Sequence, residues 1–585
     1  MRLCTASSII LWLLVVHKSD EISSPLQPYT IYRYSTELQH NVADLWWTIN
    51  ETQEEITFEL HIKTTGWIAL GISPAGGMRG ADIGLGWVDE GGEVHFQDRY
   101  ASGTSRPTID NTTTDWFALS GREQNGWTAI QFKRSLDTCD EMDVSIKSGT
   151  NNLIFAYGLE DPDMSRSDGL IFYHENRRGS RIIPLQSYGN PPSEEKFSDL
   201  DYFEFKLNNQ IVPAVESSYH CKVFKAPTNF SQRRHAIARK TIIEPNNRDL
   251  VHHLGLLECN PTAIFDDNNL PDGICDEIIA SIFQCFKSVA SIWAVGGDEI
   301  VEYPEIGGYP VGGDFEIKYY MLQMHYNNPK LIPNRRDSSG VRFYLGKQLR
   351  QYELGYLSIG ADVSYSAIAI PSGVDRFILD CYCPSEATQN FSEPVITILA
   401  ACPHTHLQGR SVWTKLIRNK KVVEYLFNAE AYDFNYQFEN LLPKPIQLYP
   451  GDELATRCIY STTDKTDITL GGERTKDEMC LHYFLYYPRM KDFSSCLSSI
   501  SEEAWKKIMN ISESTFDDEQ LGKWLKRLKW TPELVVEWQR FYNNASRSVQ
   551  AGDFELINLT KIPEYEDLQP STCHTNIPNS AMNQN

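Results

Sequence analysis

Between residues 35 and 155, apolar and polar residues alternate in short runs that are separated by glycine-rich turns. The runs at 56–62, 66–72 and 83–88 place an apolar residue at nearly every second position. Alternation with a period of two indicates strands that bury one face, and turns at this spacing are typical of an antiparallel sandwich. We therefore expect residues 35–155 to form a β-sandwich domain.

The pattern changes after this domain and then returns. Residues 156–200 are rich in Ser, Arg, Asp and Pro, which is expected of a connection between domains. From about 200 to 500 the strand-like alternation reappears, with paired glycines at 307–308, 312–313 and 471–472. This pattern predicts two further β-sandwich subdomains, one at 200–345 and one at 346–500.

The last segment, residues 501–585, has a helical pattern. Thr531-Pro532 has the sequence of a helix N-cap followed by proline at the first helical position. The apolar residues that follow recur on one helical face: Leu534, Trp538, Phe541 and Tyr542. The chain is thus predicted to be mainly β, with a short helical C-terminal segment.

Residues 1–20 have the pattern of a secretory signal peptide. Arg2 precedes an apolar stretch at 9–16, which is too short to cross a bilayer. No Ala-x-Ala cleavage site follows, so an uncleaved signal with peripheral membrane association is the alternative to a cleaved one. In either case we expect a protein of the secretory pathway, secreted or luminal, with no membrane span after the signal.

Length and charge restrict the class of protein further. With 585 residues the chain exceeds the size of a single hydrophobic core, which stops growing near about 250–300 residues. The net charge of −23 argues against nucleic acid as a partner, because phosphate binding requires a basic face. Acidity spread in this way otherwise indicates only a solvated surface.

Candidate metal ligands stand in apolar, strand-like surroundings and form two sets. The first set is His252, His253 and His325, and the second is His404, His406 and Met479. Imidazole suits copper, and a thioether favours copper(I) over zinc, calcium or magnesium. Alternate residues of a strand share a face, so His404 and His406 are expected to point the same way. These two sets predict two copper sites of unequal character.

These motifs resemble those of the copper- and ascorbate-dependent monooxygenases, and within that family those of the dopamine beta-hydroxylase-like branch. The matching segments stand in the family's order: His-His-Leu at 252–254, Met-His-Tyr-Asn-Asn-Pro at 324–329, His-Thr-His-Leu-Gln-Gly-Arg at 404–410 and Glu-Met-Cys at 478–480. The similarity runs from about residue 35 to about residue 575. A lone histidine on an apolar strand is usually a packed core residue, but the complete ordered set favours metal binding.

The resemblance implies a division of labour between the two sites. The first copper would receive electrons from ascorbate and store one, and the second would bind O2 and abstract hydrogen from a substrate C–H bond. Tyr219 and His404 are the candidate catalytic residues, and a packed strand tyrosine is the alternative for Tyr219. Gln323 is a candidate to position water or the His325 ring, and Tyr483 is a candidate to border the substrate pocket.

Residues 35–155 resemble a DOMON domain, a module that binds haem or sugar in other proteins. The segment lacks an obvious Met/His pair for haem, so we expect a structural or interaction domain. Asp82 and Asp115 are candidates for a hard-cation site, against the alternative of solvated surface carboxylates.

Cysteine usage agrees with an oxidising compartment, because 12 of the 13 cysteines follow the signal segment. The resemblance implies five pairs: Cys139 with Cys573, Cys221 with Cys275, Cys259 with Cys285, Cys383 with Cys496, and Cys458 with Cys480. Whether Cys381 and Cys402 pair is left open. Seven Asn-x-Ser/Thr sequons, the first at Asn50, are consistent with a glycoprotein.

The substrate is expected to be a small aromatic or hydrophobic molecule. Peptide-amidating relatives carry an arginine two residues before the first histidine of the His-x-His pair, whereas this chain has Cys402 there, which disfavours peptide amidation. Glu258 is a candidate partner for a substrate amine. Two alternatives to an enzyme are a secreted copper-binding protein without turnover and a DOMON-led interaction protein with a structural metal site. The intact ligand sets favour the enzyme.

Overall fold

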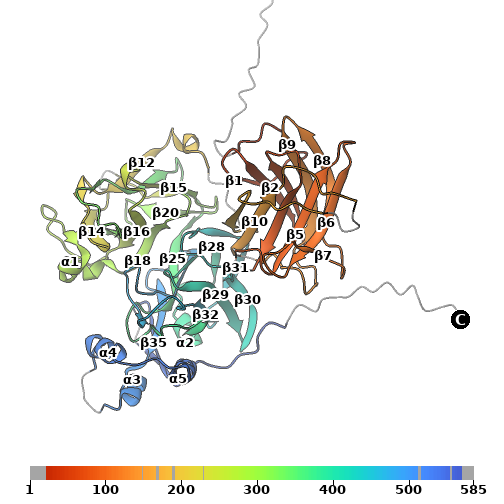
Figure 1. Cartoon of the computed structure of the whole chain (residues 1–585). Helices are drawn as coiled ribbons and strands as arrows, with labels where there is room; N and C mark the ends of the chain where they lie inside the picture. The colour runs from red at the N-terminus through yellow and green to blue at the C-terminus, as the bar shows by residue number, and fades with distance from the viewer. Residues whose placement is uncertain are drawn as a thin grey trace, which may run out of the picture. The chain divides into compact units, whose positions relative to one another are not determined.

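The computed structural model describes residues 22–74, 76–147, 149–165, 170–186, 192–227, 230–511, 516–553 and 556–569. The predicted signal segment, residues 1–20, and Cys573 lie outside these ranges. The chain divides into two compact units (Figure 1). The first contains the residues up to 146 together with 152–181, and the second contains 147–151 and the residues from 182 onward.

The first unit consists of two antiparallel sheets. One has the order β1-β2-β3-β9-β8: β1 (Tyr34–Gln39), β2 (Ala43–Asn50), β3 (Glu55–Ile62), β9 (Trp127–Ser135) and β8 (Phe117–Gln124). The other has the order β11-β10-β4-β5-β6-β7: β11 (Arg178–Ile183), β10 (Asn151–Tyr157), β4 (Ile68–Ser73), β5 (Ala81–Val88), β6 (Val94–Ala101) and β7 (Thr108–Ile109). Strand β11 comes from the segment that the sequence suggested as a connection.

An aromatic core joins the two sheets of this unit. Phe132 of β9 lies 5.1 Å from Phe96 of β6 and 5.7 Å from Phe58 of β3, measured between ring centroids. Trp116, 5.6 Å from Phe132, fills the same layer. These contacts between inward-facing residues confirm the β-sandwich that the alternating pattern predicted.

The second unit begins with a pair of sheets that hold the first ligand set. One has the order β12-β23-β15-β20-β24, with β19 paired to β15: β12 (Asp201–Lys206), β23 (Gly340–Leu345), β15 (Arg234–Ile242), β20 (Gly307–Val311), β24 (Tyr352–Glu353) and β19 (Ile300–Glu302). The other has the order β17-β14-β21-β16-β18: β17 (Asp272–Ile274), β14 (Ser217–Lys225), β21 (Tyr319–Asn327), β16 (Val251–Glu258) and β18 (Ser288–Ala294). β13 (Gln210–Ile211) pairs with β22 (Arg336–Asp337). Rings such as Phe205 and Tyr320, 5.1 Å apart, pack between the two large sheets.

The second half of this unit is another pair of sheets. The larger has the order β31-β28-β34-β25-β35-β36-β37: β31 (Asn440–Leu448), β28 (Ile396–His404), β34 (Leu481–Tyr487), β25 (Gly355–Ala361), β35 (Ser495–Ile500), β36 (Arg547–Ala551) and β37 (Ile557–Leu559). The smaller has the order β27-β32-β29-β30: β27 (Phe377–Cys383), β32 (Glu453–Tyr460), β29 (Gly409–Arg418) and β30 (Lys421–Ala429). β26 (Ala369–Ile370) pairs with β33 (Thr469–Leu470). The Cys383–Cys496 disulfide ties β27 to β35.

Helices are few, as predicted for a mainly β chain. They are α1 (Cys275–Ile282), α2 (Ser385–Thr388), α3 (Glu502–Met509), α4 (Asp518–Leu525) and α5 (Pro532–Asn544), with short 3-10 turns at Glu194–Phe197, Pro245–Asn247 and Phe283–Cys285. The Thr531 side chain caps α5 by accepting a hydrogen bond from the Leu534 N–H, as the sequence indicated. Trp538 and Tyr542 of α5 are buried.

The C-terminal segment is not helical throughout. After α5 the chain forms β36 and β37, and β36 pairs with β35 of the larger sheet. The segment therefore completes the sandwich that contains the second ligand set. No helix within the described ranges is both long enough and apolar enough to span a bilayer.

Candidate metal centre

The first ligand set lies on two neighbouring strands. His252 and His253 belong to β16, and His325 stands directly opposite His253 on β21. The register shifts between Val251 and His253, and such an extra residue re-aims side chains locally. Two successive histidines therefore reach the same point. The ligand atoms of all three histidines lie within 4.8 Å of one another.

The Nδ1 atoms converge at distances that suit one shared ion. His253 Nδ1 lies 3.2 Å from His252 Nδ1 and 3.3 Å from His325 Nδ1. Nitrogens bound at about 2.0–2.1 Å to a common metal are separated by about this distance. The other nitrogen of His325, Nε2, lies 2.9 Å from Ser217 Oγ and 3.1 Å from Thr475 Oγ1. Those hydroxyls hold the ring so that Nδ1 is left for a metal.

Burial keeps these three imidazoles neutral. It lowers the pKa of His252 to about 3 and that of His325 to about 2, and the neighbouring histidines lower both further. The pKa of His253 also falls well below its usual value, for the same two reasons. A metal must bind the neutral form of imidazole, so no proton has to leave before binding at neutral pH.

The second ligand set lies where β28 and β34 approach each other. His404 is the last residue of β28, and its register partner is Leu481 of β34. His404 Nδ1 donates to Gln437 Oε1 at 2.6 Å, and His406 Nδ1 donates to the Asp477 carbonyl at 2.9 Å. Both bonds leave Nε2 of each ring available to a metal. Met479 lines the same cavity as His404.

The strand argument for His404 and His406 is wrong in one respect. β28 ends at His404, so His406 lies in the following loop, and the two rings stand edge to face with centroids 5.3 Å apart. A buried carboxylate holds this loop in place. Glu478 accepts hydrogen bonds from the backbone N–H groups of His406 at 2.8 Å, Gln408 at 2.6 Å and Met479 at 3.3 Å. Glu478 therefore positions a histidine and the methionine of the set together.

Further contacts fix the backbone at Met479. The Tyr460 hydroxyl donates to the Met479 carbonyl at 2.7 Å, and the Cys458–Cys480 disulfide anchors the next residue to β32. Burial raises the pKa of Glu478 to about 8, opposed by its three backbone N–H donors. Glu478 and Gln437 have no role in the sequence analysis. The position of Glu478 directly before the methionine, within the Glu-Met-Cys motif, was the only available signal.

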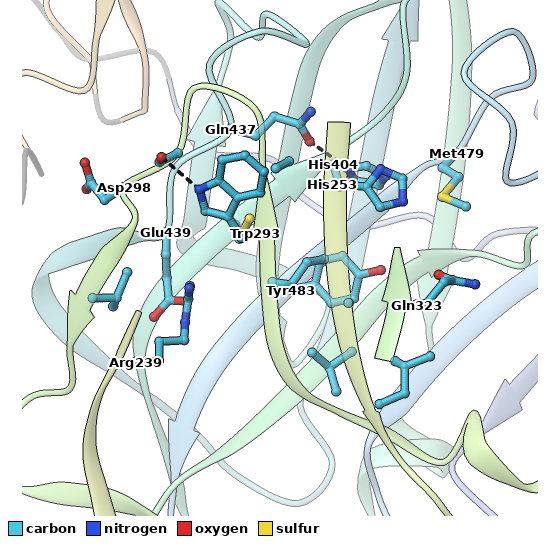
Figure 2. Close-up of a pocket in the computed structure, with 18 residues that line it drawn as sticks. Arg239, His253, Trp293, Asp298, Gln323, His404, Gln437, Glu439, Met479 and Tyr483 are labelled. Carbon is cyan, nitrogen blue, oxygen red and sulfur yellow. Dashed lines mark hydrogen bonds and ion pairs between the residues drawn. The ribbon is translucent and has the colours of Figure 1, made fainter. Parts of the chain in front are cut away.

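The two sets face each other across the junction of the two sandwiches. The ring centroids of His253 and His404 are 5.9 Å apart, and His252 stacks on Phe434 at 4.2 Å. His253, His404 and Met479 line one cavity of about 80 Å³ (Figure 2). Tyr483, the candidate to border the substrate pocket, lines it too. All of these residues belong to the second unit.

Tyr219 lies beside the first ligand set rather than in this cavity. It stands opposite His325 in the β14–β21 register, and the two rings stack with centroids 4.3 Å apart. Its hydroxyl donates to the Glu473 carbonyl. Burial raises its pKa well above the usual value, and the acidic side chains nearby act in the same direction. The phenol is thus protonated and fixed against a candidate ligand.

One other expectation is wrong. Glu258 does not reach the cavity, because it is buried in an ion pair with Arg489 at 2.6 Å and accepts from the Tyr309 hydroxyl. Gln323 lines the cavity, and its amide donates to Glu473 at 3.2 Å rather than to the His325 ring, so a role in positioning water stays a prediction. A different charged pair, Arg239 with Glu439 at 2.9 Å, lines the cavity instead.

Asp82 is not a surface carboxylate. It is buried in the first unit with Asp98 and the partly buried Asp143, and their oxygens lie within 4.8 Å of one another. Burial raises the pKa of Asp82 to about 7, and the guanidinium of Arg134, which pairs with it, opposes this rise. Asp115 contributes a backbone N–H to Asp98 rather than a ligand oxygen. The positive charge of Arg134 thus occupies the place expected for a cation.

Four of the five expected disulfides are present: Cys221–Cys275, Cys259–Cys285, Cys383–Cys496 and Cys458–Cys480. The fifth involves Cys573, which lies outside the described residues. Cys381 and Cys402, whose pairing the sequence left open, are both buried free thiols. Cys402 lines the cavity.

Two β-sandwiches that present opposed sets of neutral imidazoles, one of them with a thioether, define a class of proteins suited to soft or borderline metal ions. Comparison with known proteins narrows this class. The copper type II ascorbate-dependent monooxygenase N-terminal domain matches residues 203–333, its C-terminal domain matches residues 352–509, and the DOMON domain matches residues 39–158.

Relatives match over most of the chain. DBH-like monooxygenase protein 2 of Mus musculus is 31% identical over 568 residues, which cover 94% of this chain and 87% of that protein. DBH-like monooxygenase protein 1 of Homo sapiens is 31% identical and covers 77% and 73%. Dopamine beta-hydroxylase of Homo sapiens is 30% identical and covers 86% and 80%. The chain belongs to the copper type II ascorbate-dependent monooxygenase family, whose cofactors are copper and ascorbate.

Proposed function

We propose that this protein hydroxylates a C–H bond of a small aromatic or hydrophobic substrate, using O2 and two electrons from ascorbate. His252, His253 and His325 would hold one copper ion, and His404, His406 and Met479 a second. The observation that carries this proposal is the opposition of the two sets, with His253 and His404 only 5.9 Å apart between ring centroids. Ligands so placed favour electron passage between two ions over two unrelated structural sites.

The overall reaction balances as follows. One O2, one substrate C–H bond, two electrons and two protons give one alcohol and one water, with each electron taken from one ascorbate. When bound, copper supplies one-electron redox chemistry and the activation of dioxygen. Three imidazoles alone would serve the ion that stores an electron. The thioether of Met479 would stabilise the reduced state of the other ion, which must meet O2.

The remaining residues of the site act on the ligands and the substrate. Gln437 and the Asp477 carbonyl would fix the His404 and His406 rings through their Nδ1–H groups, at 2.6 and 2.9 Å. Tyr219 would hold His325 by stacking at 4.3 Å, and its raised pKa keeps a phenol rather than a phenolate there. Tyr483 would offer an aromatic wall to the substrate, with Cys402 in place of an anion-binding arginine.

One observation favours the alternative of a secreted copper-binding protein without turnover. The cavity of about 80 Å³ is smaller than the roughly 300–1,000 Å³ of small-molecule sites. Under our proposal the two sandwiches must separate before an aromatic substrate can enter. The four disulfides and the signal pattern support a secreted or luminal location. We propose that the mature protein has domains at residues 35–155, 200–345, 346–500 and 501–585.

Oxygen uptake tests the proposal against this alternative. The copper-loaded full chain would be mixed with ascorbate and a panel of aromatic amines, fatty alcohols and glycine-extended peptides. We expect at least one aromatic or apolar member of the panel to increase oxygen uptake, with one hydroxylated product formed per O2 consumed. The glycine-extended peptides should not increase it. His404→Ala should abolish this uptake, whereas His40→Ala, at an exposed histidine of the first unit, should not. Uptake that no panel member increases would support the copper-binding alternative.

A further inference from the structure

The cavity between the two ligand sets has a buried ion pair in its wall. Arg239 belongs to β15, in the sandwich that holds the first ligand set, and Glu439 directly precedes β31 in the other sandwich. Their side chains are only 2% and 4% exposed, and Arg239 Nη2 lies 2.9 Å from Glu439 Oε2. The Tyr356 hydroxyl donates to the same carboxylate oxygen at 2.8 Å. The pair therefore joins the two sandwiches in the wall of the cavity that His404 and Met479 also line.

Three polar atoms of the Arg239–Glu439 pair have no hydrogen-bond partner among the described residues. They are Nε and Nη1 of Arg239 and Oε1 of Glu439. Buried polar groups are almost always hydrogen-bonded, because each unpaired one destabilises the folded state. Other polar side chains of the lining follow this rule: Trp293 Nε1 donates to a backbone carbonyl at 3.0 Å, and the Gln437 amide donates to another at 2.8 Å. The unpaired atoms of the pair thus point to a ligand that supplies their partners.

The charges of the pair decide which ligand group fits. Burial would lower the pKa of Arg239, but Glu439 raises it above the usual value, so the guanidinium stays charged. A ligand carboxylate would meet the unpaired oxygen of Glu439, and a ligand ammonium would meet the guanidinium. Either group would bring a like charge into a buried site, which is unfavourable. A hydroxyl group avoids both conflicts, because its oxygen can accept from Arg239 while its proton is donated to Glu439 Oε1.

The rest of the lining separates this pair from the second ligand set. Figure 2 shows Arg239 and Glu439 at the left of the cavity and Met479 at the right, with Tyr483 between them. Asp298, another carboxylate of the lining, is only partly buried. Most other lining residues are apolar or small, among them Gly255, Leu257, Val289, Ile292, Ala294 and Val301. An elongated ligand can therefore place a hydroxyl at the pair and an apolar C–H bond towards Met479.

We propose that Arg239 and Glu439 select a substrate that carries a neutral hydroxyl group at the end remote from the reacting C–H bond. This inference rests on the proposed hydroxylation, and it narrows the small aromatic or hydrophobic substrates to those with such a hydroxyl. The hydroxyl oxygen accepts a hydrogen bond from the Arg239 guanidinium, and its proton is donated to Glu439 Oε1. Molecules with an ammonium or a carboxylate at that end are rejected by the member of the pair that has the same charge.

Equilibrium binding tests this selection without turnover. The copper(I)-loaded full chain, kept free of oxygen, would be titrated in a calorimeter with four probes that share an ethyl-substituted ring: ethylbenzene, 4-ethylphenol, 4-ethylbenzoate and 4-ethylbenzylamine. We expect 4-ethylphenol to bind about 10–100-fold more tightly than ethylbenzene, because its hydroxyl forms hydrogen bonds with charged groups. The two charged probes should bind more weakly than 4-ethylphenol. The proposal is overturned if 4-ethylphenol does not bind, or if any other probe binds as tightly.

A double variant tests whether the pair causes this preference. Arg239→Met/Glu439→Gln removes both charges at similar size, and glutamine keeps an acceptor for the Tyr356 hydroxyl. Replacing a whole buried ion pair is often tolerated, whereas removing one partner leaves an unpaired buried charge. The variant should reduce the preference for 4-ethylphenol over ethylbenzene below about threefold and leave ethylbenzene binding unchanged. A preference that survives in this variant would refute the assignment, and the four probes on the unaltered chain decide the matter even if the variant does not fold.

The exposed ion pair of Arg540 with Glu537 on α5 provides a matched control. Arg540→Met/Glu537→Gln makes the same two substitutions and should keep the full preference for 4-ethylphenol. Oxygen uptake with ascorbate, measured with the same probes, separates this inference from the proposed function. Preferential binding of 4-ethylphenol without any uptake would support the role of the pair and contradict the hydroxylation. Equal uptake with ethylbenzene and 4-ethylphenol would support the hydroxylation and overturn the selection.

Discussion

Replacement of Glu478 by glutamine tests whether one buried carboxylate organises the second ligand set. The carboxylate accepts three backbone hydrogen bonds, from His406 at 2.8 Å, Gln408 at 2.6 Å and Met479 at 3.3 Å. Glutamine has nearly the same shape but only one acceptor oxygen. If that oxygen stays with His406 and Met479, the amide NH2 faces the Gln408 N–H, and a buried donor loses its acceptor.

The expected magnitude follows from that loss. A buried donor left without an acceptor costs about 1–3 kcal/mol, so we take about 2 kcal/mol for Glu478→Gln. For a domain of about 150–250 residues this corresponds to a decrease in Tm of about 4–8 °C. Glu478→Ala removes all three acceptors and should lower Tm at least twice as far. The copper affinity of the second site should fall about 10–100-fold in Glu478→Gln, as for other residues that orient ligands.

Differential scanning calorimetry of the copper-free protein and copper(I) competition titrations measure the two effects, both above pH 8, where Glu478 is ionised. Glu502→Gln is a matched control, because Glu502 lies on the surface at the start of α3 and pairs only with Lys506 among the described ion pairs. It should leave both quantities unchanged. The reasoning about Glu478 is refuted if Glu478→Gln keeps the Tm and the second-site affinity of this control.

Three further predictions follow from the same contacts. Met479→Ile keeps an apolar side chain but removes the thioether. Copper(I) should therefore bind the second site more weakly, while about one copper per chain remains. An unchanged copper(I) affinity would show that Met479 is a packing residue. Because burial lowers the pKa of His252 and His325 to about 3 and 2, the unfolded chain binds protons below about pH 6.5 and the folded chain does not. The stability of the copper-free protein should therefore fall between pH 6.5 and 3, by about 1.4 kcal/mol per histidine at pH 5.5, and a denaturant midpoint that rises on acidification would contradict this. Cys381 and Cys402 are buried, and the pKa of each thiol is raised to about 12. Alkylation mapped by mass spectrometry should therefore label them only after unfolding. Labelling of either thiol in the native protein would contradict this and place it at an accessible surface.

The sandwich folds could be predicted because each strand carries its own period-two signal. The run at 56–62, for example, became β3 (Glu55–Ile62) with little change in its bounds. β11 (Arg178–Ile183) and β36 (Arg547–Ala551) were missed because their strand character comes from pairing with β10 and β35 rather than from alternating apolar residues. β11 is the edge strand of its sheet, and edge positions tolerate polar sequences, so the local pattern there carries little information.

The candidate ligands could be predicted because soft ligands in ordered motifs are rare. The residues that hold those ligands in place could not be predicted. Glu478 lies 72 positions after His406, and no local pattern indicates that its carboxylate would reach that backbone N–H. Glu258 was misplaced for the complementary reason, since its partner Arg489 is remote and turns it away from the cavity.

Copper content tests the central claim most directly. The purified full chain would be reconstituted with copper, separated from loosely bound ions and measured by elemental analysis, alone and with each ligand set disabled. The account predicts two copper ions per chain, close to one in His404→Ala/His406→Ala and close to one in His252→Ala/His253→Ala. A content of zero or one in the unaltered chain, or a double variant that still holds two, would contradict it.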